Sequence, residues 1–351
     1  MLVLRAHGVE GFCTGLPAYR ALREAFPRHH LVLATRPEVA PLAELTSTVD
    51  EVLSVPGTDA PLHWRGPSPD VAVNLQDQGP ESHGLLHALW PARTIAYASA
   101  AAPGEVEGPP WKDGEDEVAR WCRLLDSFGI EVDESYRTLR RPDRPSPAPG
   151  AVVIHVGDQD AGRGWPLDRY VAVSRALRSA GYEVVVTGSP PADGSRDVIG
   201  LAALVASAAL VVSEDTGVAH LAVAFGIPSV TLCGWRTPGE SGLPTSRPEH
   251  TVLRKALVRG PQLSVLTDAA DRVPGAAAAD GVEADRMLLA LTPEDVQTAA
   301  EALLTPLPPP AVVDLTRLRP RAGSGTHPRA PRGSRGPRGM SGSGPRGPGR
   351  S

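Results

Sequence analysis

Ten residues in the second half of the chain bring a carboxylate, a hydroxyl and an imidazole together around a glycine. Residues 213–222 read Ser-Glu-Asp-Thr-Gly-Val-Ala-His-Leu-Ala and follow an apolar run that is typical of a buried strand. We expect a helix to begin at Thr216, with Asp215 as its N-cap. Thr216 and His220 are four residues apart and therefore share one helix face. Gly217 has no side chain and would let a ligand approach the backbone.

The chemistry that this segment could perform is phosphate binding. A helix that starts after a parallel strand offers free N–H groups and a partial positive charge to an anion. Ligands of open α/β sheets bind outside the carboxyl ends of the strands, where this helix must begin. Thr216 and His220 could therefore hydrogen-bond a diphosphate. The same residues also fit a purely structural role as helix cap, close-packed glycine and core-edge histidine, so the segment alone leaves both interpretations open.

The elements that must position these residues alternate along the chain. Strands are expected at 1–4, 31–33, 52–55, 71–75, 151–156, 183–187, 210–213 and 229–232, and helices at 17–26, 115–128, 167–180, 201–208, 216–225 and 293–304. The strands are short apolar runs, and the helices have apolar residues at helical spacing. Alternating strands and helices predict an α/β protein with doubly wound parallel sheets.

A proline-rich stretch divides this pattern into two halves. Residues 140–150 contain four prolines, cannot form a helix and predict a stiff linker. We therefore expect one Rossmann-like domain at 1–139, a second at 151–305 and a cleft between them. Residues 306–351 are rich in Arg, Gly and Pro, have no pattern that could bury a face, and are expected to be a disordered tail.

Composition excludes several classes of protein. The chain has 351 residues, a net charge of −5 and three cysteines without CxxC spacing, which does not suit a small disulfide scaffold. No apolar run approaches the roughly 18 residues of a membrane span, so we expect a cytoplasmic protein. There is no Walker A loop and no complete dinucleotide fingerprint. The arginines of the tail lack interleaved aromatic residues, which favours a solubilising extension or weak contact with an anionic membrane over specific nucleic-acid binding.

Several blocks of the chain, in order and spacing, resemble glycosyltransferase family 9, the ADP-heptose:lipopolysaccharide heptosyltransferases. The family carries a D-T-G-x-x-H-L-A-x-A-x-G-x-P stretch, which this chain matches from Asp215 to Pro228. Residues 17–27 are similar to the first helix of the family, residues 154–157 and 163–166 to the strand and basic-x-Trp-Pro loop of its second domain, and residues 184–188 to the next strand. The resemblance covers roughly residues 1–304.

The resemblance implies a GT-B fold with an acceptor-side N-terminal domain and a donor-side C-terminal domain. It implies an inverting, metal-independent transfer of a sugar of the heptose type from a nucleotide diphosphate sugar such as ADP-heptose, with no other cofactor. The acceptor would be a glycan or a lipid-linked glycan, which would suit a location at the inner face of the cell membrane. Asp215, Thr216, Gly217 and His220 would bind the donor diphosphate, and Arg163 would neutralise the leaving phosphate.

The chain departs from the family where the catalytic base is expected. The family places an Asp six residues before the Pro of the first helix, and this chain has Gly11 there, with Glu10 one position earlier. Glu10 and His7 are the candidate bases, because an inverting transfer needs a group that takes the proton of the acceptor hydroxyl. Both residues also fit as ordinary members of a Gly-rich loop at 7–15.

Two further departures concern the donor side. Residues 189–200 are expected to form a turn, where the family has a helix and a strand that help to form the pocket for the nucleotide's base and ribose. Asp158-Gln159-Asp160 matches a metal-binding DxD pattern only superficially and is interpreted as a solvated acidic loop. These departures leave a second hypothesis open, a catalytically weak GT-B relic that binds a nucleotide sugar or glycan without turnover.

Overall fold

The computed structural model describes residues 1–102, 106–157, 164–188, 197–234, 238–255 and 286–304. Residues Met1–Pro306 form one compact unit, which contains two five-stranded sheets. The predicted tail lies outside the described residues. Within the described part of the chain, no helix is long and apolar enough to cross a membrane.

The N-terminal sheet is parallel throughout and has the order β3-β2-β1-β4-β5. Its strands are β1 (Leu2–Leu4), β2 (Val32–Thr35), β3 (Glu51–Ser54), β4 (Val71–Asn74) and β5 (Arg93–Ile95). The helices of this half are α1 (Val9–Thr14), α2 (Leu16–Ala25), α3 (Ala40–Ala43), α4 (Pro80–His87) and α5 (Glu117–Ser127). This is the 3-2-1-4-5 order of a doubly wound sheet, with its switch point between β1 and β4.

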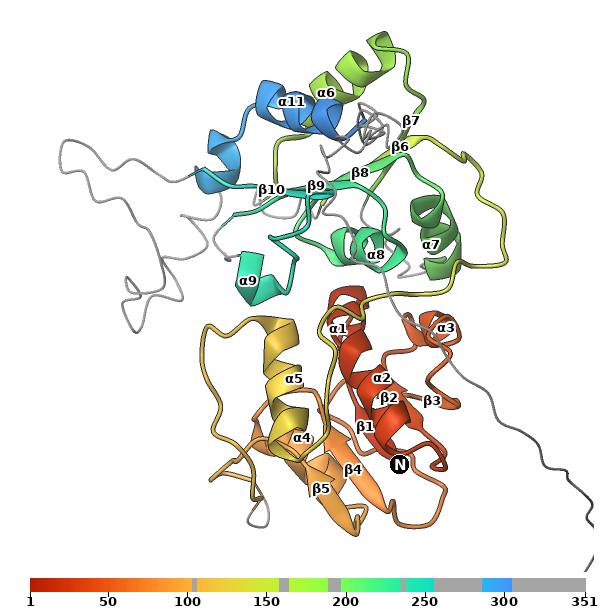
Figure 1. The fold of residues 1–351 in the computed structure, drawn as a ribbon, viewed down its shortest axis with the longest axis vertical. Helices are drawn as coiled ribbons and strands as arrows, with labels where there is room; N and C mark the ends of the chain where they lie inside the picture. The colour runs from red at the N-terminus through yellow and green to blue at the C-terminus, as the bar shows by residue number, and fades with distance from the viewer. Residues whose placement is uncertain (103–105, 158–163, 189–196, 235–237, 256–285, 305–351) are drawn as a thin grey trace, which may run out of the picture. The chain divides into compact units, whose positions relative to one another are not determined.

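The C-terminal sheet is also parallel and has the order β10-β9-β8-β6-β7 (Figure 1). Its strands are β6 (Val152–His155), β7 (Val184–Thr187), β8 (Leu210–Glu214), β9 (Ser229–Leu232) and β10 (His250–Leu253). The helices are α6 (Leu167–Ser179), α7 (Val198–Ala206), α8 (Gly217–Phe225), α9 (Pro238–Ser241) and α11 (Pro293–Leu304). Here the chain switches direction between β6 and β8, so α8 begins beside the switch point.

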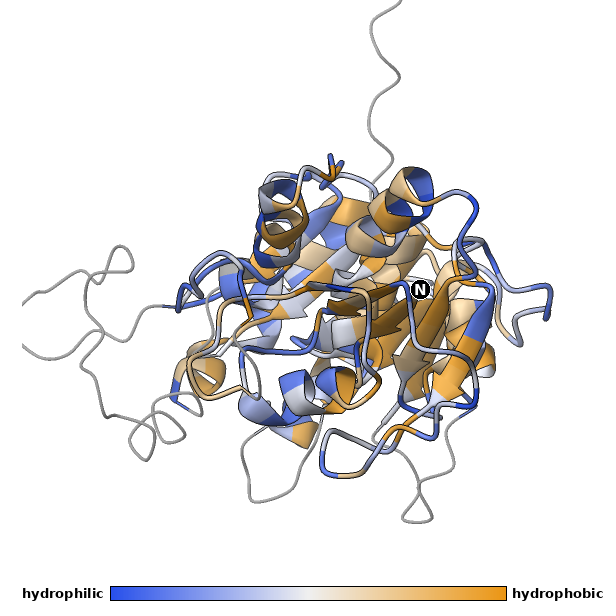
Figure 2. Cartoon of the chain, turned by 90° about the horizontal axis from the view of Figure 1, so that it is seen from below, coloured by the Kyte–Doolittle hydropathy of each residue, from blue (hydrophilic) through white to orange (hydrophobic). Residues whose placement is uncertain are grey.

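The apolar strands are buried on both faces, as parallel sheets require. On β1, Val3 belongs to one hydrophobic cluster and Leu2 and Leu4 to another, and all three side chains are fully buried. The cluster that includes Val3 continues through α2, α7 and α8 to Val153 of β6, so one apolar core joins the two halves. Figure 2 shows the strands near the N-terminus in the orange of apolar residues.

These observations confirm the predicted fold class. Every predicted strand and helix is present, with ends shifted by a few residues. The Gly-rich loop predicted at 7–15 is wrong, because residues Val9–Thr14 form α1. Gly11 lowers the helix propensity of this segment, but the complete burial of Phe12 favours the helix through packing. The exact domain boundaries at 139, 151 and 305 stay predictions.

The shortened segment after β7 also differs from its prediction. Helix α7 begins at Val198, three residues earlier than expected, because the Asp197 carboxylate caps it by accepting a hydrogen bond from Gly200 N at 2.8 Å. Residues 197–200 therefore belong to a helix and its cap rather than to a turn, while 189–196 lie outside the described residues. Among the strands that the structure describes, β7 pairs only with β6, and it ends the sheet.

Candidate active site

The helix predicted to bind phosphate begins directly beyond the carboxyl end of β8. Its N-cap is Thr216, which has extended dihedrals (φ −137°, ψ 171°), and no side chain caps it. The predicted N-cap, Asp215, is therefore wrong. The Asp215 carboxylate does not cap the helix but faces the side chain of His220, with Oδ1 3.5 Å from Nε2.

Thr216 and His220 share one helix face, as the spacing predicts. Oγ1 of Thr216 and Nε2 of His220 are both buried, and neither forms a hydrogen bond with the residues that the structure describes. Buried polar groups normally have partners, and those that lack one require an explanation. A ligand with acceptor oxygens would satisfy both groups. The structure thus brings Asp215, Thr216 and His220 together at the start of α8.

Glycine is needed at position 217 for close helix packing, whereas the sequence suggested that it makes room for a ligand. A Cβ at this position would lie 2.6 Å from Cβ of Val9 and 3.2 Å from the backbone N of Glu10. The space over the glycine therefore belongs to α1 of the N-terminal half rather than to a ligand. Figure 1 shows α1 directly below α8. This close approach places Glu10 next to the helix that carries Thr216 and His220.

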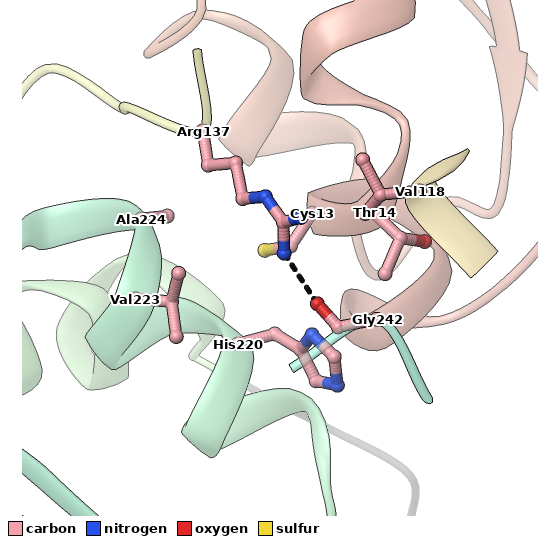
Figure 3. A pocket seen from close by; sticks show the side chains of 8 residues that line it. All are labelled: Cys13, Thr14, Val118, Arg137, His220, Val223, Ala224 and Gly242. Atoms are coloured by element: carbon pink, nitrogen blue, oxygen red, sulfur yellow. Dashed lines mark hydrogen bonds between the residues drawn. The ribbon is translucent and has the colours of Figure 1, made fainter. Parts of the chain in front are cut away.

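A small pocket lies where α1, α5 and α8 meet. It is lined by Cys13, Thr14, Val118, Arg137, His220, Val223, Ala224 and Gly242 (Figure 3). Its volume of about 10 Å³ suits a single water molecule. Arg137 donates a hydrogen bond to the carbonyl oxygen of Gly242. Burial raises the pKa of the Cys13 thiol, so that this side chain is neutral, and Arg137 supplies the positive charge of the pocket.

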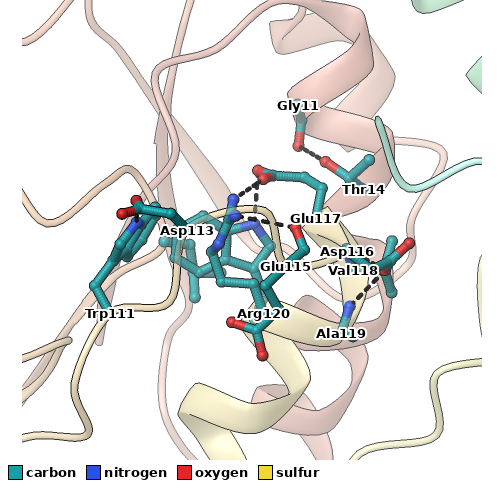
Figure 4. Close-up of polar contacts among 12 residues, drawn as sticks. Gly11, Thr14, Trp111, Asp113, Glu115, Asp116, Glu117, Val118, Ala119 and Arg120 are labelled. Carbon is teal, nitrogen blue, oxygen red and sulfur yellow. Dashed lines mark hydrogen bonds and ion pairs between the residues drawn. The ribbon is translucent and has the colours of Figure 1, made fainter. Parts of the chain in front are cut away.

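Arg5, the residue directly after β1, is fully buried and ties α1 to its neighbours. Its guanidinium donates to the carbonyl oxygens of Gly11 (2.8 Å) and Leu75 (2.5 Å) and to Oγ1 of Thr14 (2.9 Å). Its Nη2 also lies 2.7 Å from Oε1 of Glu117 on α5. Figure 4 shows Glu117 close to Gly11 and Thr14 of α1. Sequence reasoning missed this residue, although an arginine directly after an apolar strand was a visible signal.

The Arg5–Glu117 pair is charged on both sides. Burial by itself would raise the pKa of Glu117, but the charge and hydrogen bond of Arg5 outweigh it and lower the pKa. Glu117 also accepts hydrogen bonds from Arg120 and from the indole N–H of Trp121 (3.0 Å). The guanidinium of Arg5 lies 4.7 Å from the centre of the Trp121 ring. A satisfied buried ion pair therefore fixes the position of α1.

The two candidate bases stand at the start of α1. Glu10 occupies the second position of the helix rather than a tight turn. His7 precedes the helix, and its Nε2 lies 3.1 Å from the carbonyl oxygen of Gln76. Burial lowers the pKa of His7, and the nearby charge of Arg5 lowers it further.

The Trp-Pro loop of the C-terminal half packs against the end of β8. Oε1 of Glu214 accepts hydrogen bonds from the backbone N of Trp165 (2.9 Å) and from the hydroxyl of Tyr170 (2.8 Å). A Cβ at Gly157 would lie 2.8 Å from the Glu214 carboxyl group, so a side chain there would displace that carboxylate. Sequence reasoning missed Glu214, which draws this loop to the strand that precedes α8.

Other predicted site residues lie outside the described residues, namely Arg163 and the acidic triplet Asp158-Gln159-Asp160. Within the described ranges, no group of three or more His, Cys, Asp or Glu side chains could hold a metal ion.

Comparisons with known proteins point to one family. Residues 196–266, which include α7 and α8, match the model of glycosyltransferase family 9 (heptosyltransferase). No curated protein matches the sequence. Among solved structures, E. coli ADP-heptose LPS heptosyltransferase II is 16% identical, with a TM-score of 0.63 over 86% of this chain and 98% of that one.

Two further structures have the same fold. The family 9 glycosyltransferase of Veillonella parvula is 16% identical, with a TM-score of 0.63 over 86% of this chain and 96% of that one. E. coli heptosyltransferase WaaC with ADP is 16% identical, with a TM-score of 0.62 over 86% of this chain and 99% of that one. The chain is therefore similar to the family 9 glycosyltransferases in sequence around α7 and α8, and it shares the GT-B fold with these solved structures.

Proposed function

We propose that the protein transfers a sugar of the heptose type from a nucleotide diphosphate donor to a hydroxyl of a glycan or lipid-linked glycan, with inversion and without a metal. The observation that carries this proposal is the start of α8. Thr216 and His220 present buried polar atoms without hydrogen-bond partners among the described residues, at the carboxyl end of a parallel sheet. The match to the family 9 model covers the same residues.

The donor diphosphate would bind at this helix start. The N-terminal turn of α8 carries a partial positive charge, and a hydroxyl and an imidazole beside it are hydrogen-bond partners for phosphate oxygens. Nε2 of His220, which has no hydrogen-bond partner among the described residues, would donate to an oxygen of the ligand. Arg163, two residues before Trp165, would add the cation that stabilises the leaving diphosphate.

Structures of similar fold support the class of donor. One holds WaaC with ADP, and another holds WaaC with ADP-2-deoxy-2-fluoro heptose at 15% identity and a TM-score of 0.58. An ADP-sugar is therefore the first donor to test. The arginine-rich tail could give weak contact with anionic lipid beside a lipid-linked acceptor, at the inner face of the cell membrane.

Binding without turnover is the alternative function. It is favoured by Gly11, which leaves α1 without an acidic side chain at that position, and by the short segment, residues 188–197, between β7 and α7 in the donor half. Release of nucleoside diphosphate separates the two functions, because a binding protein would hold the donor without consuming it.

The first prediction concerns Thr216. We expect Thr216→Val to weaken binding of ADP-heptose by about 5- to 30-fold, since it removes one hydrogen bond to a charged group, worth roughly 1–2 kcal/mol. Isothermal titration calorimetry measures the change. The matched control is Thr35→Val, because Oγ1 of Thr35 is also buried without a hydrogen-bond partner among the described residues but lies at the end of β2.

Wild-type protein and the Thr35→Val variant should bind the donor equally well. Equal affinity in the Thr216→Val variant would contradict the placement of the diphosphate at α8. Failure of the wild-type protein to bind any of ADP-, UDP- or GDP-linked sugars would contradict both functions.

A further inference from the structure

The side chain of His7 fills the space that a side chain at position 11 would need. A Cβ on Gly11 would lie 2.3 Å from Cβ and 2.9 Å from Cγ of His7, and 3.4 Å from Nη2 of Arg5. No side chain can stand at position 11 while His7 is in place. His7 therefore supplies the functional group at this point of α1, beside the buried guanidinium of Arg5.

The hydrogen bonds around Gln76 select one tautomer of His7. Nε2 of His7 faces the carbonyl oxygen of Gln76 at 3.1 Å, and a carbonyl oxygen can only accept. The neutral ring therefore carries its proton on Nε2 and its lone pair on Nδ1. Gln76 is held in turn, because its Oε1 accepts from Ala6 N at 2.7 Å and its own N donates to Oδ1 of Asn74 at 3.0 Å.

The surroundings of His7 keep the ring neutral at physiological pH. Burial lowers its pKa below the ordinary value of 6.5, and the charge of Arg5 lowers it further. Three interactions raise the pKa of His7 and only partly offset this lowering: the hydrogen bond with the Gln76 carbonyl and the charges of Glu117 and Asp77. Among the described residues, Nδ1 has no hydrogen-bond partner, and the side chain is only partly buried, so that a substrate hydroxyl can reach it.

We propose that His7 is the general base of the transfer, acting through Nδ1, and that Gln76 is the residue that positions it. This rests on the proposed function. In the step, Nδ1 of His7 takes the proton of the acceptor hydroxyl while the oxygen of that hydroxyl forms the bond to the anomeric carbon of the donor sugar. The bond from that carbon to the phosphate oxygen breaks, and the nucleoside diphosphate leaves with the electron pair. The imidazolium then returns its proton to solvent.

The experiment measures ADP release from ADP-heptose with water as the acceptor hydroxyl. We expect His7→Gly to lower kcat by 100-fold or more with KM for the donor unchanged within about 3-fold, the usual size of a general-base contribution. The matched control is His63→Ala, which changes an exposed histidine of a loop and should leave both constants unchanged. A His7→Gly variant with wild-type kcat would overturn the proposal.

The pH profile distinguishes His7 from Glu10. In the wild-type protein, kcat/KM should fall as the pH passes through the lowered pKa of His7, which lies on the acid side of 6.5, and this acid limb should disappear in His7→Gly. Persistence of the limb in His7→Gly, with its loss in Glu10→Gln, would assign the base to Glu10 and overturn the proposal.

Two further measurements test the geometry. Gly11→Ala should displace His7 and lower kcat in the wild-type background, but should have no further effect in His7→Gly, which lacks the clashing Cβ. Nitrogen-15 NMR of the wild-type protein near pH 8 should show the proton of His7 on Nε2, and a proton on Nδ1 would overturn the proposal. Gln76→Ala should lower kcat and shift the acid limb, with donor affinity kept.

The proposed function can fail independently of this inference. If the wild-type protein binds ADP-heptose but releases no ADP, either in water or with glycan acceptors present, the proposed transfer fails and the base assignment falls with it. If ADP is released by His7→Gly as fast as by the wild type, the transfer stands and only the base assignment fails.

Discussion

At the scale of single residues, the buried Arg5–Glu117 pair has the largest energetic consequence. A buried ion pair contributes little net stability when intact, but removal of one partner leaves a charge without compensation. Arg5 also satisfies Gly11, Thr14 and Leu75, so that its loss would leave several buried acceptors unpaired. We therefore expect the folded state to depend on this pair.

We expect Arg5→Met to lower the free energy of unfolding by about 3–5 kcal/mol, because the buried acceptors of Gly11, Leu75 and Thr14 would lose their donor and Glu117 would keep only Arg120 as a cationic partner. Urea denaturation measures the change. The matched control is Glu24→Gln, which breaks the exposed Arg20–Glu24 pair and should leave the urea midpoint nearly unchanged. A loss in Arg5→Met as small as that of the control would show that the pair is not stabilising the fold.

The same pair predicts how stability depends on pH. Because the pKa of Glu117 is lower in the folded protein than its ordinary 4.5, the unfolded chain takes up the proton first as the pH falls. The stabilisation is thus fully present above about pH 5 and is lost as the pH falls through the lowered pKa of the folded state. Glu117→Gln should flatten this acid loss, as measured by urea midpoints between pH 3 and 6.

At the scale of elements, the approach of α1 to α8 depends on Gly217. We expect Gly217→Ala to cost about 1–3 kcal/mol of stability and to weaken donor binding, since its Cβ would lie 2.6 Å from that of Val9 and the two helices would have to separate. Thermal unfolding and calorimetry measure the two effects. Gly188→Ala is the control, because a Cβ there meets no atom of the described residues within 4 Å.

Replacement of Val9 by Gly in the Gly217→Ala background should recover part of the lost stability, since it removes the atoms that clash. Full additivity of the two substitutions would contradict the contact between α1 and α8.

The elements were far easier to predict from the sequence than the site. Apolar runs such as residues 151–154 and 210–212 indicate buried strands, and the sequence of α8 indicates both a helix and candidate phosphate-binding residues. The short α1 was missed because its glycines argue against a helix and only the burial of Phe12 reverses the balance. The close approach of Gly217 to Val9 depends on tertiary packing that no local pattern reports, and the approach of Gly11 to His7 depends on the turn that begins α1.

At the scale of the whole compact unit, one hydrophobic cluster spans both sheets. It contains residues from β1, α2, α7, α8 and β6, so neither half buries this surface alone. We therefore expect the residues of Met1–Pro306 to unfold in one cooperative transition, for which the calorimetric and van't Hoff enthalpies agree. Two resolved transitions in scanning calorimetry would show that the halves are independently stable.

Strand β7 lies at the edge of the C-terminal sheet, and this position determines where the sheet could gain a further strand. Val184–Thr187 offers its outer row of backbone N–H and C=O groups to no other strand that the structure describes, and the side chain of Val186 is 48% exposed. A chain insertion after Thr187 could add a strand at this margin without giving any existing strand a new neighbour. The sheet can therefore grow outward there, while β6, β8 and the start of α8 keep their register.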